Sequence, residues 1–361
     1  MRYDIILKLS LIVTALVSGG VSALFTPLSI KVAKKVGAID TPKDDRRMHT
    51  QSIPRLGGMA IFISALLTII LLRKLFMPWL AETFQLRTDP MDKLSGVIVG
   101  AILIYALGMA DDIHSLKIYV KLIAEVAIAT IVFLLGARVQ LIYALGLDLS
   151  GNGLGPMVFS YLFTVVWIVA ITNMINLIDG LDGLAAGVTM IASIAIAFAA
   201  YIHGQYIVTF FMIAIAGAAL GFLPFNFYPA KTFMGDGGAL LLGFLLASGS
   251  IIGETKSATV VAISIPVLVL GVPIFDVVFA ILRRVRKKES IFSADRGHLH
   301  HQLANIGMGQ RRATLMIYGI SSIMGVAAII LSRQLYYEAL LLFLVALLFI
   351  FIFVWDWNKQ R

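Results

Sequence analysis

Runs of close to twenty apolar residues follow one another along the chain, separated by short polar breaks. A helix of that length crosses a hydrocarbon core of about 30 Å, and the strict alternation of a membrane β-barrel strand is absent. A helix also satisfies its own backbone hydrogen bonds, which lipid cannot do. The pattern therefore predicts an all-α integral membrane protein, a single polytopic domain over residues 1–361 with about eleven transmembrane helices. The predicted spans are 5–30, 57–76, 94–110, 118–136, 157–175, 184–202, 207–223, 238–254, 259–282, 313–332 and 335–355.

Composition agrees with a membrane protein, since 60% of the residues are hydrophobic and only 14% are charged. The first span is longer than the apolar core of a cleaved signal peptide, so we expect it to remain as the first helix. The chain has no cysteine, which excludes disulfides, thiolate zinc sites and cysteine nucleophiles.

The distribution of basic residues predicts the orientation. Most of the 29 Lys and Arg residues fall after odd-numbered spans or in the C-terminal tail, which places the N-terminus outside and the C-terminus in the cytoplasm. The net charge of +9 also favours anionic lipids and anionic substrates. The expected cytoplasmic loops, which we predict to form the active site, are about 31–56, 111–117, 174–184, 224–237 and 283–312.

Every unusual polar cluster falls on the predicted cytoplasmic side. The clusters are GMADDIHSLK (108–117), NMINLIDGLDGLA (173–185), FNFYPAKTFMGDGG (225–238) and ADRGHLHHQL (294–303). A transporter usually carries polar groups near the bilayer midplane, where this chain has few. The one-sided distribution therefore favours an enzyme, with a nucleotide-sugar or lipid-linked-sugar transporter as the alternative.

Asp111 and Asp112 stand at the C-terminal end of a predicted helix, where the helix dipole and their mutual repulsion are both unfavourable. A solvated helix end is the ordinary explanation of such a pair. A divalent cation, or a phosphate with its metal, would relieve the repulsion. Lys121, one turn into the next span, could also reach a phosphate at the membrane surface.

In the second cluster, Asn173 and Asn176 are one helical turn apart, as are Asp179 and Asp182 if the helix continues. These side chains suit helix capping, but their oxygens also suit Mg²⁺, which prefers hard ligands and binds substrate phosphates.

Asp236 precedes a predicted helix in a glycine-rich segment that allows a ligand to approach the backbone. Phe233 and Asn226 would suit a nucleobase, or serve as an interfacial anchor and a helix cap. Lys231 considered alone is more typical of a snorkelling side chain.

The fourth cluster is a weak zinc signal, and its arginine favours an anion instead. Solvated loop residues are the alternative. The residues concerned are Arg296, His298, His300 and His301. Asp276 lies within a predicted span and is either functional or paired with Arg283.

These clusters, in this order, resemble the polyprenyl-phosphate N-acetylhexosamine-1-phosphate transferases, and RRMHTQSIPRLGG (46–58) is similar to that family's opening motif. The resemblance implies metal binding by Asp236 and Asn176. It implies catalytic roles for Asp111, Asp112, Asp179, Asp182, His298, His300 and His301. It implies substrate binding by Lys121, Asn173, Leu177, Gly180, Asn226, Lys231, Phe233, Arg296 and Arg55, with Phe233 and Asn226 flanking uracil.

The resemblance further implies transfer of GlcNAc-1-phosphate from UDP-GlcNAc to polyprenyl phosphate with Mg²⁺ or Mn²⁺, at the cytoplasmic face of a bacterial plasma membrane. UDP-MurNAc-pentapeptide is the rival donor, although DRGHLHH is closer to the N-acetylglucosamine group. A homodimer is a family expectation, and no nucleic-acid partner is expected. The acceptor phosphate is already largely ionised, so a general base is not obligatory, and Asp112 either deprotonates or orients it.

Overall fold

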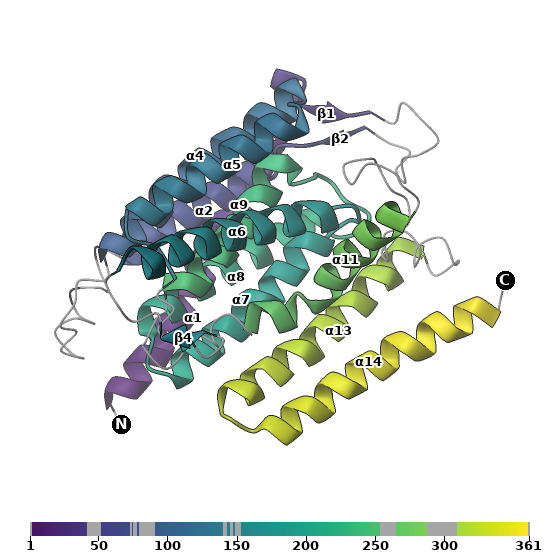
Figure 1. Ribbon diagram of the computed structural model, residues 1–361. Helices are drawn as coiled ribbons and strands as arrows, with labels where there is room; N and C mark the ends of the chain where they lie inside the picture. The colour runs from purple at the N-terminus through teal and green to yellow at the C-terminus, as the bar shows by residue number, and fades with distance from the viewer. Residues whose placement is uncertain are drawn as a thin grey trace.

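The structure is a computed structural model that describes residues 2–41, 52–72, 74, 78, 91–139, 143–144, 147–148, 153–252, 265–286 and 309–359. Helices make up almost all of its regular structure, with two short antiparallel strand pairs between them (Figure 1). The helices are α1 (Arg2–Val36), α2 (Gly58–Leu71), α4 (Met91–His114), α5 (Ile118–Leu134), α6 (Leu154–Ile178), α7 (Leu184–Ile202), α8 (Tyr206–Asn226), α9 (Gly235–Ile252), α11 (Gly271–Arg286), α13 (Gly309–Ser332) and α14 (Tyr336–Lys359). The strands are β1 (Ile39–Asp40), β2 (Ile53–Pro54), β3 (Tyr143–Ala144) and β4 (Leu147–Asp148).

The prediction of an all-α membrane protein is confirmed. Helices α1, α4, α6, α7, α8, α9 and α13 are long and apolar enough to cross a membrane. The other four predicted spans each overlap a described helix, namely α2, α5, α11 or α14. The total of eleven spans and the orientation of the termini stay predictions.

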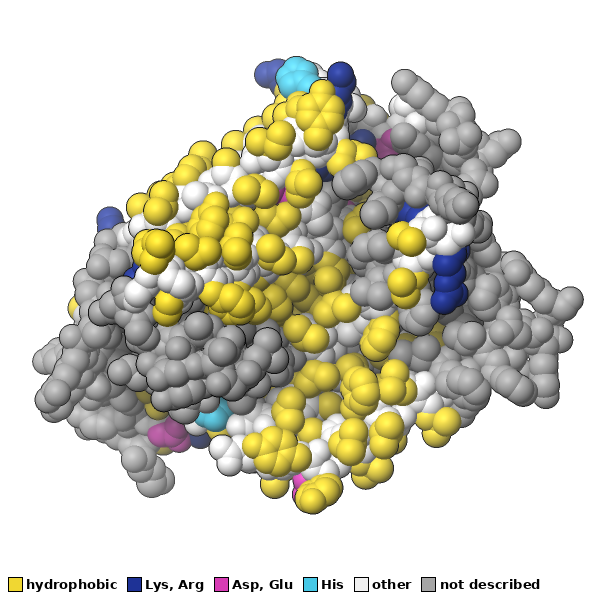
Figure 2. All heavy atoms as spheres, in the orientation of Figure 1, with side chains coloured by type: hydrophobic (Ala, Val, Ile, Leu, Met, Phe, Trp, Pro, Cys, Tyr) yellow, Lys and Arg dark blue, Asp and Glu magenta, His cyan; other side chains and the backbone are white. Residues whose placement is uncertain are grey.

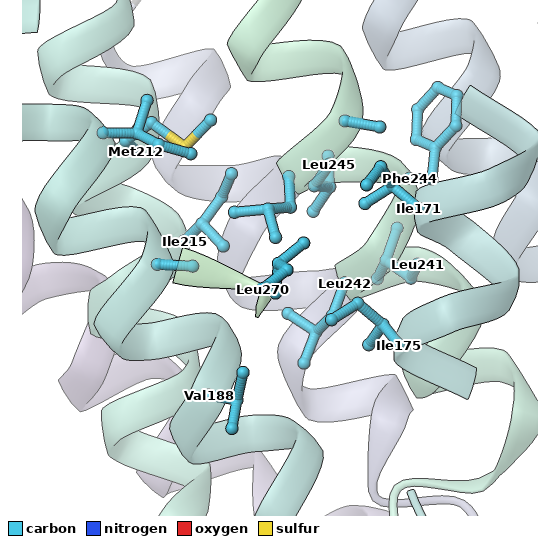
Figure 3. Packing of buried hydrophobic residues seen from close by; sticks show 14 of the residues in the cluster. Ile171, Ile175, Val188, Met212, Ile215, Leu241, Leu242, Phe244, Leu245 and Leu270 are labelled. Carbon is cyan, nitrogen blue, oxygen red and sulfur yellow. The ribbon is translucent and has the colours of Figure 1, made fainter. Parts of the chain in front are cut away.

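Helix α9 is the centre of the bundle, because almost all of its membrane-length window is buried inside the protein. It packs against α4, α6 and α2 and also touches α7 and α8. Figure 3 shows Leu241 and Leu242 of α9 close to Ile171 and Ile175 of α6. Lipid is as apolar as these side chains, so close packing of helices, more than removal from water, holds such a core together.

Small residues allow that close packing. A Cβ added to Gly221 of α8 would stand 2.0 Å from the carbonyl oxygen of Gly19 in α1. Beside this contact, the hydroxyl of Ser18 donates to the carbonyl of Ala214 at 2.6 Å, and the hydroxyl of Ser64 in α2 donates to the carbonyl of Ser18 at 2.6 Å. Helices α1, α2 and α8 are therefore joined by backbone contacts and buried hydroxyl bonds.

The outer face of the bundle is apolar. Figure 2 shows hydrophobic side chains over much of one face, with Lys and Arg side chains toward its margins. Helix α14 lies on the outside against α13, and the start of α1 and the end of α14 lie toward opposite ends of the bundle (Figure 1). This exterior is the one expected of a protein surrounded by lipid.

Candidate active site

The carboxylate of Asp112 caps the N-terminus of the central helix α9. Its two oxygens accept hydrogen bonds from the backbone N–H groups of Asp236 at 2.9 Å and Gly237 at 3.0 Å. Arg55 approaches the same carboxylate, with its guanidinium 3.6 Å from Oδ1. Asp112 belongs to the C-terminal turn of α4, where the dipole is unfavourable, but it meets the positive end of α9. The adjacent helix therefore compensates for the position of this carboxylate.

Glycines permit this contact between α4 and α9. Gly235 has a φ of +71°, and an added Cβ would stand 2.5 Å from Oδ2 of Asp112. One turn earlier in α4, a Cβ on Gly108 would stand 2.5 Å from the Cα of Gly237. The glycine-rich sequence around Asp236 thus serves the approach of two helices, and it sets the position of Asp236 itself.

Asp111, Lys121 and Asp236 form an ionic cluster from three helices. The ammonium of Lys121 in α5 lies 2.5 Å from Oδ2 of Asp111 and 3.9 Å from Oδ2 of Asp236. Oδ1 of Asp111 accepts a hydrogen bond from the backbone N–H of Leu116 at 2.6 Å. Two carboxyl groups therefore share one cation.

The segment that contains Arg55, before α2, is hydrogen-bonded to the segment before α9. The Thr232 hydroxyl and the Phe233 N–H donate to the carbonyl of Pro54 at 2.9 and 2.8 Å. In return, the N–H of Gly57 donates to the carbonyl of Phe233 at 2.9 Å. These bonds hold Arg55 beside α9, although the two segments are far apart in the sequence.

The junction between α6 and α7 brings two further carboxylates. Asp179 ends α6, and Asp182 follows the turn and accepts a hydrogen bond from the N–H of Ala230 at 2.9 Å. Burial raises the pKa of Asp179 well above 3.8, and the nearby carboxylates of Asp236 and Asp112 raise it further. Added positive charge at this place would stabilise the ionised form of Asp179.

The remaining predicted residues divide by exposure. Asn226 is buried, and its amide donates to the carbonyl of Thr232 at 3.0 Å, so it supports the loop before α9. Asn176 and Phe233 are half-buried, whereas Leu177, Gly180 and Lys231 are exposed. The predicted residues Arg296, His298, His300 and His301 lie outside the described residues, as does the side chain of Asp276.

Sequence reasoning missed Glu125. This carboxylate lies one turn beyond Lys121 in α5, is 2% exposed and accepts a hydrogen bond from the amide of Asn173 in α6. It falls inside a predicted span, where an ionisable residue is functional by default. Applied to this position, the rule that singled out Asp276 would have found it.

The sequence of this chain is similar to those of known glycosyl transferases. The sequence profile of glycosyl transferase family 4 matches residues 94–254. A Bacillus subtilis (strain 168) protein named probable undecaprenyl-phosphate N-acetylglucosaminyl 1-phosphate transferase is 37% identical over 326 residues, which cover 90% of this chain and 86% of that protein. The chain belongs to the family of polyprenyl-phosphate N-acetylglucosaminyl 1-phosphate transferases.

Two more relatives support the assignment of this chain to that family. A decaprenyl-phosphate N-acetylglucosaminephosphotransferase of Mycobacterium tuberculosis (strain ATCC 25618 / H37Rv) is 33% identical over 310 residues, covering 80% of this chain and 74% of the relative. An undecaprenyl-phosphate alpha-N-acetylglucosaminyl 1-phosphate transferase of Thermotoga maritima is 28% identical over 320 residues, covering 88% and 89%. The profile match spans every carboxylate of the cluster from Asp111 to Asp236.

Proposed function

We propose that this protein transfers GlcNAc-1-phosphate from UDP-GlcNAc to a polyprenyl phosphate, giving polyprenyl-diphospho-GlcNAc and UMP. The names of its relatives supply the acceptor class and the sugar. One structural observation carries the proposal, namely the convergence of Asp111, Lys121 and Asp236 from three helices. This arrangement gives acidic and basic groups where a phosphorylated substrate and a cation could both bind.

We also propose Mg²⁺ for this site. Asp236, which shares Lys121 with Asp111, and Asn176 would be the protein ligands that the family resemblance implies. In the part of the chain that the structure describes, no three His, Cys, Asp or Glu side chains gather as a ready metal centre. Mg²⁺ does not require one, because it commonly takes one or two carboxylates and completes its shell with water and substrate phosphates. When bound, Mg²⁺ would neutralise phosphate charge.

The balance of charged side chains in the site also favours a bound cation. Asp111, Asp112 and Asp236 form ion pairs with Lys121 and Arg55. Among these described residues, three carboxylates therefore face two basic side chains. A site for two anionic substrates would otherwise repel them. Excess carboxylate is thus an argument for a bound cation as well as for the basic side chains.

In the proposed reaction, an oxygen of the lipid phosphate attacks the β-phosphorus of UDP-GlcNAc. The bond from that phosphorus to the bridging oxygen breaks, and UMP leaves with the bond's electrons. Lys121 would stabilise the charge on the phosphates, and Arg55, whose guanidinium lies 3.6 Å from Oδ1 of Asp112, would add to this. The acceptor phosphate is mostly ionised near neutral pH, since phosphoesters have a second pKa of about 6.

In this scheme, Asp112 orients the helix that carries Asp236. Both of its oxygens already accept N–H groups from α9, and its side chain is 1% exposed. It therefore holds Asp236 in place through the helix that carries it. We assign no general base to the reaction.

We further propose that the site faces the cytoplasm of a bacterial plasma membrane. The acceptor's hydrocarbon chain can stay in lipid while its phosphate reaches helix ends at the membrane surface. The excess of basic residues on the same predicted side supports this orientation. The homodimer stays a prediction.

The decisive experiment measures UMP release by the purified full-length protein with a panel of donors. UDP-GlcNAc should release UMP only when polyprenyl phosphate and Mg²⁺ or Mn²⁺ are present, and Asp236→Asn should abolish the release. Asp4→Asn, which changes an exposed carboxylate on α1, is the matched control and should keep wild-type activity. Release from UDP-MurNAc-pentapeptide alone would refute the sugar assignment. Flux across liposomes without UMP would support a transporter instead.

A further inference from the structure

Glu125 is a buried carboxylate that the proposed reaction does not use. Its Oε2 accepts the amide of Asn173, while its Oε1 has no hydrogen-bond partner among the described residues. It stands one turn along α5 from Lys121, close enough for the two charges to interact. Burying a carboxylate is costly, and an unpartnered oxygen raises the cost. A residue kept under these conditions calls for a function.

The contacts of Asn173 show what Glu125 does to it. The amide nitrogen of Asn173 donates both to Glu125 and, at 3.0 Å, to the backbone carbonyl of Val169. A backbone carbonyl only accepts hydrogen bonds, and so does an ionised carboxylate, so the nitrogen must face them. Both N–H bonds of the amide are thereby used, and its oxygen Oδ1 can accept a hydrogen bond from a group outside the described residues.

We propose that Glu125 is a positioning residue that fixes the amide of Asn173 so that it offers an oxygen, and no N–H, to the substrates. This inference rests on the proposed function of the site. An oxygen in this place can bind a cation or accept a hydroxyl or N–H of the donor nucleotide sugar. It cannot donate to a phosphate. Glu125 acts through Asn173 and touches no substrate itself.

Two substitutions at Glu125 separate its hydrogen bond from its charge. Glu125→Gln keeps an acceptor for Asn173 and removes the charge, so kcat should stay within about threefold of wild type. Glu125→Leu removes both, which leaves the amide held only by the Val169 carbonyl, and kcat should fall about tenfold to a hundredfold. Thermal unfolding of the leucine variant should be unchanged or raised, because an incompletely bonded buried carboxylate stabilises little. Wild-type kcat in Glu125→Leu would overturn the proposal.

A rescue experiment keeps the proposal testable even if Glu125→Leu fails to fold. Asn173→Asp places a second carboxylate against Glu125 and should lose nearly all activity. Adding Glu125→Gln supplies an amide that can turn to donate to the new carboxylate. The Val169 carbonyl still faces a carboxylate oxygen, so recovery is partial, and the double variant should be about tenfold more active than Asn173→Asp. A double variant no better than the single one would refute the contact as the cause.

The wild-type protein assayed in parallel tests the proposed function separately. If it releases no UMP from UDP-GlcNAc, the donor assignment fails. If it does and the variants depart from the order given above, only the role of Glu125 fails. A purely structural role would lower stability together with activity, and the double variant would then recover both together, whereas a positioning role changes kcat without a matching change in thermal unfolding.

Discussion

Replacing Asp112 by asparagine tests whether the cap of α9 sets the position of the site. Asparagine has nearly the shape of aspartate, but it replaces one carboxylate oxygen by an NH₂ group. In the wild-type protein the two oxygens accept N–H groups of Asp236 and Gly237 at 2.9 and 3.0 Å. The variant can keep one of these bonds. At the other, two donors would face each other.

The expected loss can be worked from these contacts. A hydrogen bond to a charged group contributes about 1.5–3 kcal/mol, and losing an ordinary helix N-cap costs about 1 kcal/mol. Because Asp112 is 1% exposed, water cannot replace the lost acceptor. The weakened attraction to Arg55 adds little across 3.6 Å at a half-exposed guanidinium. We expect Asp112→Asn to lower the free energy of unfolding by about 2–3 kcal/mol.

Activity should fall in parallel, because the first turn of α9 carries Asp236. A shift of about 1 Å in a positioned group can cost a hundredfold in rate. The measurement is UMP release together with thermal unfolding in detergent, with Asp111→Asn as the comparison. Asp111 makes no hydrogen bond to the α9 backbone in the described structure, and asparagine can still accept from Leu116. Asp111→Asn removes the negative charge 2.5 Å from Lys121, so it should abolish turnover, and it should lower stability only through the loss of this ion pair while the cap of α9 stays in place. The reasoning is refuted if Asp112→Asn unfolds and turns over like wild type.

Three further predictions test packing and the metal. Gly221→Ala should lower stability by about 1–3 kcal/mol, since its Cβ would stand 2.0 Å from a carbonyl of α1, whereas Gly20→Ala, with nothing within 4 Å, should be neutral or stabilising in a thermal melt. Gly108→Ala would press on Gly237 at 2.5 Å, so we expect kcat to fall more than tenfold while much of the fold remains. A chelator should abolish UMP release, and Mg²⁺ should restore it; full activity in chelator would exclude a required divalent cation.

Much of the fold could be predicted because lipid imposes a simple rule on the chain. An apolar run must form a helix, and each predicted span overlaps one in the described structure. The boundaries were less predictable. Helix α1 continues to Val36 and α6 to Ile178, beyond the expected ends at residues 30 and 175, because polar residues at a membrane surface can stay helical where hydropathy no longer requires it.

The proximity of the polar clusters was predictable only as a shared membrane side. Sequence gives no distance between Asp111 and Asp236, which the structure joins through Lys121. It also could not show that both oxygens of Asp112 bind the backbone of α9, since that depends on where the N-terminus of α9 lies. The hydrogen bond between Glu125 and Asn173 depends on the packing of α5 against α6, which apolar patterning does not specify.

One physical constraint connects these findings. In the proposed reaction, Asp236 lies at a membrane surface where substrates can reach it, yet it is carried by the most deeply enclosed helix among those described. Glycines let α2 and α4 close on the first turn of α9, and Asp112 binds its free N–H groups from outside. The closely packed interior of the bundle therefore extends directly to the first turn of α9, which carries Asp236. Small changes in helix packing at the first turn of α9, such as at Gly108, should alter catalysis because no flexible loop lies between the core and Asp236.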